Sequence, residues 1–417
     1  MENDKVQVTS SKMGLWAATA LVFSGMVGSG ILFLPYKMAS CGSWGIFSWI
    51  MGAIMTYCMF LSFAGVNNYY LKNMSNKNPD IMDFLKLKYC DRNAFLLAFG
   101  HFFAMAICAS VTALALGNYF LGLFPGSILC AKSIASLSLL LMFFINLISF
   151  GAANALNFWL TLAKLLFFLL IAILGVGYAS SYKPVFGSPT LLFSGAATTM
   201  FAFMGIEFGI FASGSIENPE ENVIKATKYG LISASLIFIG VYLAALFIIP
   251  DLSLTKTPIY DCSIVLFGKI GAKIIAVVAI LSCLTGLNGN LVVQGNSLRN
   301  FSKKKHIVNC FDVETSQGFP WRGALTSLTI SILIIWFSSL DLEVFAVTFI
   351  GVLYTSVVVL DILLNGLAPQ SLLAIVSSAI MLCNSFTLPV IIGSAFIYLV
   401  GYCIKFFSCK ECKKEKI

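Results

Sequence analysis

Residues 24–35 read Ser24-Gly25-Met26-Val27-Gly28-Ser29-Gly30-Ile31-Leu32-Phe33-Leu34-Pro35 and lie inside an apolar run from Met13 to Met38. Glycines at three positions within six residues weaken a helix and let another group approach the backbone closely. We predict that the helix unwinds at Gly28-Ser29-Gly30. The half-helix that restarts at Ile31 then points free N–H groups and the positive end of its dipole at an anionic group, such as a carboxylate. The alternative is a small-residue packing face or a plain kink.

The composition is that of a protein embedded in a lipid bilayer. Hydrophobic residues make up 59% of the 417 residues and charged residues only 11%, and the mean hydropathy is +0.92. These values exclude a water-soluble domain of this length and indicate a polytopic, all-α membrane protein. The net charge of +8 comes from basic residues in short loops. Basic residues in short loops determine the topology of a membrane protein, so the positive charge does not indicate a nucleic-acid partner.

The cysteines favour neither a disulfide framework nor a metal site. The twelve cysteines are scattered through spans and loops without paired spacing. The single CxxC pattern, Cys409 to Cys412, lies in a lysine-rich tail with no histidine near it. The sequence accordingly predicts no metal, no cofactor and no catalytic residue.

Twelve apolar segments are long enough to span a bilayer, which requires about 20 mainly apolar residues. They lie at about 14–40, 44–70, 93–123, 129–150, 155–180, 191–213, 227–250, 271–298, 322–340, 342–366, 370–386 and 388–407. Eleven spans are the alternative, because the last two segments are barely separated. We expect one transmembrane domain at 14–407, between an N-terminal tail at 1–13 and a lysine-rich tail at 408–417.

The distribution of basic residues predicts the orientation in the cell (inner) membrane. With the N-terminus inside, 19 of the 26 lysines and arginines fall on the interior side, six on the exterior side, and Lys164 within a span. Interior loops carry the excess of positive charge in membrane proteins. Both tails are therefore expected to be cytoplasmic. The acidic loop Glu217-Asn218-Pro219-Glu220-Glu221-Asn222 on the same side is expected to begin a helix.

A second glycine-rich span follows five spans after the first. Residues 196–214 carry Gly205, Gly209, Gly214 and an acidic residue, Glu207, in an otherwise apolar run. Matching defects five helices apart are what an inverted repeat of five plus five helices predicts, with the substrate between the two breaks. We assign the repeats to about 14–180 and 191–366, followed by two further helices at about 370–407.

The sixth span and three other spans contain polar residues at membrane depth, where such groups are costly unless they face a cavity or a partner. Asn288 and Asn290 either line the pocket or form a structural hydrogen bond between helices. Lys164 either binds and releases a proton during transport, extends to the interface, or permanently fixes span five against span one. Glu207 is a candidate for gating or proton coupling, with a hydrogen bond to a neighbouring backbone N–H as the alternative. His101 is another candidate for modulation by pH, with a structural role beside Phe102 and Phe103 as the alternative.

The first-span motif resembles the first-helix signature of the amino acid–polyamine–organocation superfamily. Phe203-Met204-Gly205-Ile206-Glu207, with the following Glu217-Asn218-Pro219, is similar to that family's sixth-helix and loop signature. The resemblance is nearest to the basic amino acid and polyamine antiporters, such as the arginine/agmatine antiporters. It implies a leucine-transporter-like fold with broken helices 1 and 6. It also implies a carrier of amino acids or related amines, and it is compatible with a homodimer.

The resemblance also implies a substrate site. Ser29 and the N–H of Gly30, next to Gly28, would hold the substrate carboxylate. The carbonyl groups of Met26, Phe201 and Met204, beside Gly205, would accept the ammonium group. Phe201 stands where the arginine/agmatine antiporter has a tryptophan that covers the substrate, and Glu207 matches an acidic residue implicated in gating.

Two positions differ from the arginine/agmatine antiporter, and a third residue bears on the coupling mechanism. Gly25 stands where the arginine/agmatine antiporter has an asparagine, and Asn290 where it has a second tryptophan, so stacking against a guanidinium is expected to be weaker. Lys164 resembles the fifth-helix lysine of proton-coupled members, which occupies the sodium position of sodium-coupled relatives.

The leading hypothesis is therefore a proton-coupled carrier, and the alternative is an obligatory antiporter, such as arginine/agmatine or ornithine/putrescine. A channel should show a repeated pore motif, and a membrane enzyme should cluster reactive side chains at one depth. Neither pattern occurs in the sequence.

Overall fold

A computed structural model describes residues 14–28, 30–74, 79–124, 126–148, 164–211, 216–337, 342–385 and 387–414. The predicted N-terminal tail and Ser29 lie outside these residues. The helices are α1 (Leu15–Met26), α2 (Gly30–Lys37), α3 (Trp44–Asn73), α4 (Ile81–Leu85), α5 (Asp91–Leu123), α6 (Ile128–Ile148), an unlabelled helix (Lys164–Ser180), α8 (Thr190–Thr199), α9 (Phe208–Phe211), α10 (Pro219–Ile248), α11 (Pro258–Lys303), α12 (Trp321–Phe337), α13 (Leu342–Asn365), α14 (Pro369–Ser385) and α15 (Leu388–Lys414).

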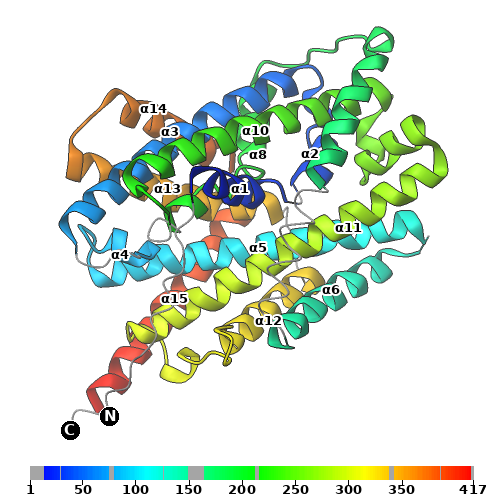
Figure 1. The fold of residues 1–417 in the computed structure, drawn as a ribbon. Coiled ribbons are helices and arrows are strands. Elements are labelled where there is room, and N and C mark those ends of the chain that lie inside the picture. Colours follow the sequence, from blue (N-terminus) through cyan, green and yellow to red (C-terminus); the bar gives the residue numbers. More distant parts are fainter. Residues whose placement is uncertain are drawn as a thin grey trace.

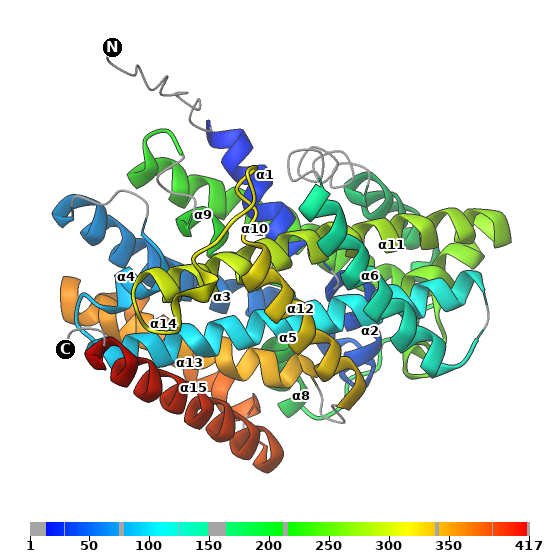
Figure 2. The ribbon, with the colours of Figure 1, turned by 90° about the horizontal axis from the view of Figure 1, so that it is seen from below.

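Helix α5 runs through the middle of the bundle and packs against α6, α11 and α13. Helices α3 and α10 pack together in a second layer, and the short α1 packs against α10 (Figure 1). Helices α6 and α12 cover α5 from the other side, and α15 runs along the edge of the molecule (Figure 2). The residues at the inner ends of the short broken helices, such as Met26, Val27 and Phe203, are buried.

Seven of the described helices are long and apolar enough to cross a membrane: α3, α5, α6, α10, α11, α13 and Leu388–Phe406 of α15. The bent pair α1 and α2 forms an eighth span. Three shorter apolar helices, Lys164–Ser180, Trp321–Phe337 and Pro369–Ser385, coincide with the predicted spans five, nine and eleven. The protein is a multi-pass membrane protein, and the total of twelve spans stays a prediction.

Helix α11 extends from Pro258 to Lys303, and its part after Gly268 contains the predicted span at 271–298. A kink at Gly268, where φ is 70°, divides it. The predicted helix start after the sixth span is confirmed. Helix α10 has Pro219 as its first residue and two glutamates in its first turn, where the helix dipole favours negative charge.

Both predicted helix breaks are present. Helix α1 ends at Met26, α2 begins at Gly30, and the two halves are bent by 43°. In the sixth predicted span, α8 ends at Thr199, turns follow at 200–207, and α9 begins at Phe208.

The two breaks touch through their backbones. A Cβ atom at Gly205 would lie 2.7 Å from the carbonyl oxygen of Gly25, and one at Gly25 would lie 2.7 Å from the Phe208 ring. Gly205 also has a φ of 103°, which residues with a side chain rarely adopt. Glycine at these two positions therefore permits the crossing of the first and sixth spans.

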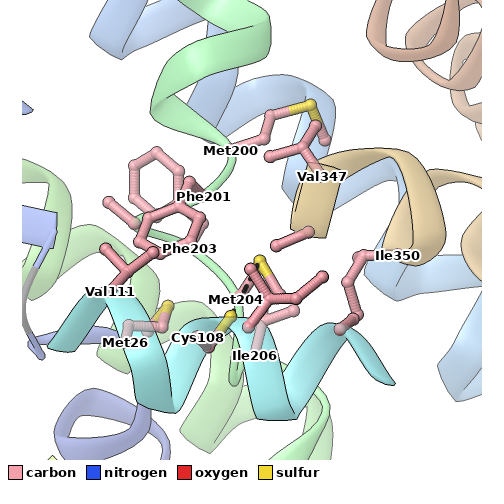
Figure 3. Close-up of a cluster of buried hydrophobic side chains, with 14 of the residues drawn as sticks. Met26, Cys108, Val111, Met200, Phe201, Phe203, Met204, Ile206, Val347 and Ile350 are labelled. Atoms are coloured by element: carbon pink, nitrogen blue, oxygen red, sulfur yellow. Dashed lines mark hydrogen bonds between the residues drawn. The ribbon is translucent and has the colours of Figure 1, made fainter. Parts of the chain in front are cut away.

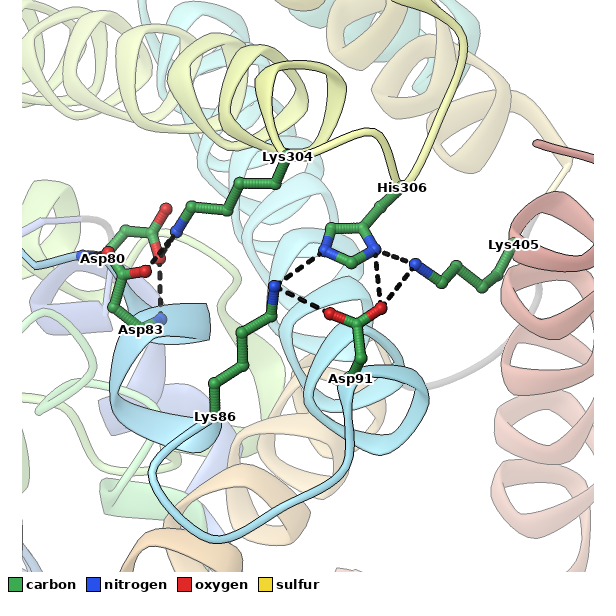
Figure 4. A network of polar contacts seen from close by, with 7 residues as sticks. All are labelled: Asp80, Asp83, Lys86, Asp91, Lys304, His306 and Lys405. Carbon is green, nitrogen blue, oxygen red and sulfur yellow. Dashed lines mark hydrogen bonds and ion pairs between the residues drawn. The ribbon is translucent and has the colours of Figure 1, made fainter. Parts of the chain in front are cut away.

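Ion pairs connect helix ends on both sides of the bundle. Lys37, at the end of α2, pairs with the buried Glu343 at the start of α13. On the side where α4 lies (Figure 1), Lys304 follows α11 and contacts Asp80 and Asp83, with its Nζ 2.7 Å from a carboxylate oxygen of each (Figure 4). The same two aspartates form a reciprocal capping box at the start of α4. These contacts attach α4 to the end of α11.

A neighbouring group of four residues, Lys86, Asp91, His306 and Lys405, joins α5, the loop after α11 and α15 (Figure 4). We call it the Asp91 network. Lys86 and Lys405 each lie 2.8 Å from a carboxylate oxygen of Asp91. His306 is buried between them, and its Nε2 atom lies 3.1 Å from Lys86 Nζ. Burial, assisted by the charge of Lys405, lowers the pKa of His306 to about 4. His306 is therefore neutral at physiological pH.

Candidate functional site

A cavity of about 260 Å³ lies beside the two helix breaks and is lined by α1, α5, the 200–207 turns and α11. Seven of the eight predicted substrate-binding residues line it: Met26, Gly28, Gly30, Phe201, Met204, Gly205 and Asn290. The eighth, Ser29, lies outside the described residues. The fold thus brings to one cavity residues that are far apart in the sequence: Met26 and Asn290 are separated by 264 positions.

One side of the cavity is apolar and rich in sulfur. Met26, Phe201 and Met204 come from the two breaks, and Met105 and Cys108 come from α5. Figure 3 shows Met26, Cys108 and Met204 close together beside the turns, and the Cys108 Sγ atom lies 3.9 Å from the sulfur of Met204. The sequence reasoning missed the α5 residues, because that span carries no glycine cluster. The available signal was polar Thr112, which also lines the cavity.

The other side of the cavity is polar and comes mainly from α11, with Thr285, Asn288 and Asn290. Asn288 accepts a hydrogen bond from the side chain of Asn146 in α6, at 2.5 Å. Asn146 itself is buried. Asn288 therefore combines the two predicted roles: it forms a hydrogen bond between helices and it lines the cavity.

The backbone at the breaks is partly engaged in local hydrogen bonds. The carbonyl of Met26 accepts from the amide of Gly28 at 2.8 Å, and the carbonyl of Phe201 accepts from Met204 at 3.4 Å. A carbonyl oxygen has two lone pairs and can accept a second bond. Gly30 begins α2 at the cavity, where the first amides of the helix have no partner within the helix.

Lys164 binds the first break directly. Its buried Nζ atom donates a hydrogen bond of 2.6 Å to the carbonyl oxygen of Val27. Val27 is the residue at which α1 loses helical geometry, with a ψ of 72°. Lys164 therefore supplies a hydrogen bond to a carbonyl group that has lost its partner within the helix because of the break.

Glu207 is buried directly behind the second break. One carboxylate oxygen accepts from the Tyr354 hydroxyl at 2.7 Å and from the Gly205 amide at 3.1 Å. The other lies 3.5 Å from Nε2 of His101. The fold thus brings together two predicted residues, Glu207 and His101, and adds Tyr354 of α13. Sequence reasoning could not find Tyr354, because a single tyrosine in an apolar span is not distinctive.

A second cavity, of about 430 Å³, adjoins the first and shares Leu21, Phe208 and Val293 with it. It is also lined by His101 and by Asp80, which lies directly before α4. The two cavities therefore adjoin at three apolar residues, and the second cavity extends toward the α4 end of the bundle. His101 contacts Glu207 and borders this second space.

Comparison with known proteins identifies the family. The family model described as amino acid permease matches residues 13–400. The chain is 24% identical over 330 residues to the putrescine transporter PotE of Haemophilus influenzae, covering 76% of this chain and 74% of the relative. It is 28% identical over 334 residues to a putative arginine/ornithine antiporter of Bacillus subtilis, covering 69% of each. A further relative is the serine/threonine exchanger SteT of Bacillus subtilis, at 25% identity over 67% of this chain and 66% of SteT.

The fold agrees with a solved transporter structure. Mhp1, a nucleobase-cation-symport-1 family transporter in a closed conformation, superposes with a TM-score of 0.56 over 92% of this chain and 93% of its own. The sequences are only 13% identical, so this likeness concerns the leucine-transporter-like fold alone. With the family match over most of the chain and both helix breaks present, this protein belongs to the amino acid permease family of the amino acid–polyamine–organocation superfamily.

Proposed function

We propose that this protein is a secondary active transporter that carries an amino acid or a related amine by alternating access. The observation that carries the proposal is the cavity bordered by both broken helices. Unwound backbone at membrane depth is tolerated where it lines a cavity, and transporters of this type bind their substrates there. The named relatives carry putrescine, ornithine, serine or related compounds.

In this proposal the substrate lies between the two breaks in one orientation. Its carboxylate faces the start of α2, at Ser29 and Gly30, where the helix dipole and free amides favour an anion. Its ammonium group faces the carbonyls of Met26, Phe201 and Met204. Phe201, which packs edge-on against Phe33 at 5.6 Å, covers one end of the site.

Proton coupling is the preferred mechanism. Lys164 contacts the first break and Glu207 contacts the second, so a change of protonation at either residue alters the backbone that binds the substrate. His101 provides a route between Glu207 and the second cavity. An ammonium or carboxylate at this depth is costly unless paired, which favours a change of protonation during the cycle.

Obligatory exchange is the alternative mechanism, and the names of several relatives favour it. They include a putative arginine/ornithine antiporter, a serine/threonine exchanger and a cadaverine/lysine antiporter. In both mechanisms we place the protein in the cell (inner) membrane with both termini in the cytoplasm, on the basis of its lysine and arginine distribution.

Flux into proteoliposomes tests the proposal and separates the mechanisms. Radiolabelled amino acids and polyamines are offered to vesicles that are empty or preloaded with unlabelled amino acids, with and without an acidic exterior. Uptake into empty vesicles that requires the pH gradient supports proton coupling, and uptake restricted to preloaded vesicles supports exchange. Absence of protein-dependent uptake for every compound in both formats contradicts the transport proposal.

A further inference from the structure

The polar side of the central cavity contains an acceptor that no described residue satisfies. Asn290 donates from its Nδ2 atom to the carbonyl of Gly286, one turn earlier in α11, at 3.1 Å. Its Oδ1 atom is buried and accepts no hydrogen bond from the described residues. Leaving such an acceptor unpaired costs free energy, so a donor from a bound molecule is favoured there.

A second amide lies two residues away in the same helix. The Oδ1 atom of Asn288 accepts a hydrogen bond from Asn146, which connects Asn288 to α6. Asn288 and Asn290 both line the cavity. Side chains two residues apart in a helix do not face each other, so among the described residues the unpaired acceptor of the α11 side is that of Asn290 alone.

The electrical character of the cavity is neutral. None of the described residues that line it is charged. Glu207, the acidic residue at the second break, does not line the cavity. Its carboxylate contacts Tyr354, Gly205 and His101 instead. A charged side chain on the substrate would lose its hydration here without gaining a counter-charge. At about 260 Å³ the cavity is also smaller than the roughly 300–1,000 Å³ of sites for drug-sized ligands.

We infer, on the basis of the proposed transport function, that Asn290 is a specificity-determining residue. The substrate is a small neutral amino acid whose side chain donates a hydrogen bond, through a hydroxyl or a carboxamide group. Asn290 Oδ1 accepts this bond. The apolar side formed by Met26, Cys108 and Met204 contacts the carbon atoms.

Pairs of amino acids with similar shapes test this inference on the purified, full-length protein. Threonine is compared with valine, and asparagine with leucine, as competitors of radiolabelled threonine uptake, together with lysine and putrescine. A hydrogen bond to an otherwise unpaired acceptor predicts that the polar member of each pair binds at least about tenfold more tightly. We expect lysine and putrescine to compete weakly.

Two variants assign the effect to Asn290. Asn290→Leu should reduce the ratio between threonine and valine toward one, whereas Asn290→Asp should increase competition by lysine and putrescine, because it supplies a counter-charge. Asn384→Leu is the matched control, since Asn384 forms the same type of bond, to Ile380 at 2.8 Å, on the exposed side of α14. It should keep the wild-type ratio.

Each outcome has a defined meaning. Any of three results overturns the inference while the transport proposal stands. Valine and threonine compete equally, lysine or putrescine competes more strongly than threonine in the wild type, or the ratio is unchanged in Asn290→Leu. If direct binding, measured as thermal stabilisation, is absent for every amino acid and amine, the proposed function fails and the inference fails with it.

Discussion

The crossing of the two broken helices predicts a large effect for a single methyl group at Gly205. In Gly205→Ala the new Cβ atom would lie 2.7 Å from the carbonyl oxygen and 2.8 Å from the carbonyl carbon of Gly25. These are backbone atoms, so no side-chain rotation relieves the overlap. The residue would also keep a φ of 103°, which is unfavourable for alanine.

The magnitude follows from two contributions. Holding a residue with a side chain in a sparsely populated backbone region costs roughly 1–3 kcal/mol. Forcing an additional carbon into a packed site typically costs about 1–3 kcal/mol more. Together they amount to about 2–6 kcal/mol, and the lower limit already changes an equilibrium by roughly 30-fold. We therefore expect Gly205→Ala to lower the thermal midpoint and to abolish most transport.

Thermal unfolding can be followed by a thiol-reactive fluorescent dye, because unfolding exposes buried cysteines: Cys41, Cys58, Cys108, Cys262 and Cys283. The control is Gly289→Ala, which lines the same cavity but has no atom within 4 Å of its added Cβ. Alanine is also preferred to glycine within a helix. The control should therefore retain the wild-type midpoint. A midpoint and transport rate of Gly205→Ala equal to those of the wild type would refute the close backbone crossing.

Three further predictions concern other parts of the site and the bundle. Gly30→Leu should abolish transport without preventing membrane insertion, because even a Cβ atom there would lie 3.0 Å from Cα of Ala202; normal uptake by correctly inserted protein contradicts it. Lys164→Ala removes the bond to Val27 and should abolish the pH dependence of uptake; unchanged proton coupling excludes the role proposed for Lys164. An exposed histidine has a pKa near 6.5, whereas the pKa of His306 in the folded protein is about 4. As the pH falls, the unfolded chain therefore binds a proton before the folded protein does. The free energy of unfolding consequently falls as the pH drops from about 6.5 toward 4. Between pH 6.5 and pH 5.5 the free energy of unfolding of the wild type should fall by about 1 kcal/mol, whereas that of His306→Gln should not. Thermal midpoints of both proteins at these two pH values measure the difference, and equal losses contradict the account.

The helix breaks could be predicted from the sequence because their cause is local. Glycines at 25, 28 and 30, and at 205, 209 and 214, are unusual at the centre of an apolar span, and their backbone consequences do not require tertiary contacts. The start of α10 at Pro219 was predictable for the same reason, since proline and acidic residues favour the first turn of a helix.

The partners of the buried polar groups could not be predicted, because they come from distant helices. Tyr354 donates to Glu207 from 147 positions away, and Asn146 donates to Asn288 from 142 positions away. The sequence indicates only that such groups need a partner or a cavity, not which one they have. The span at 271–298 was predictable from its apolar composition, whereas the helical segment from Pro258 to the kink at Gly268 was not predicted.

The central claim is that the substrate lies between the two broken helices, and a substrate-bound structure tests it most directly. Electron cryomicroscopy of the full-length protein in lipid nanodiscs, with the best-transported amino acid at saturating concentration, is the decisive measurement. We predict density in the cavity between Gly30, Met204 and Asn290, with the substrate carboxylate at the start of α2. Substrate density elsewhere, with this cavity filled by side chains or by lipid, would contradict the account.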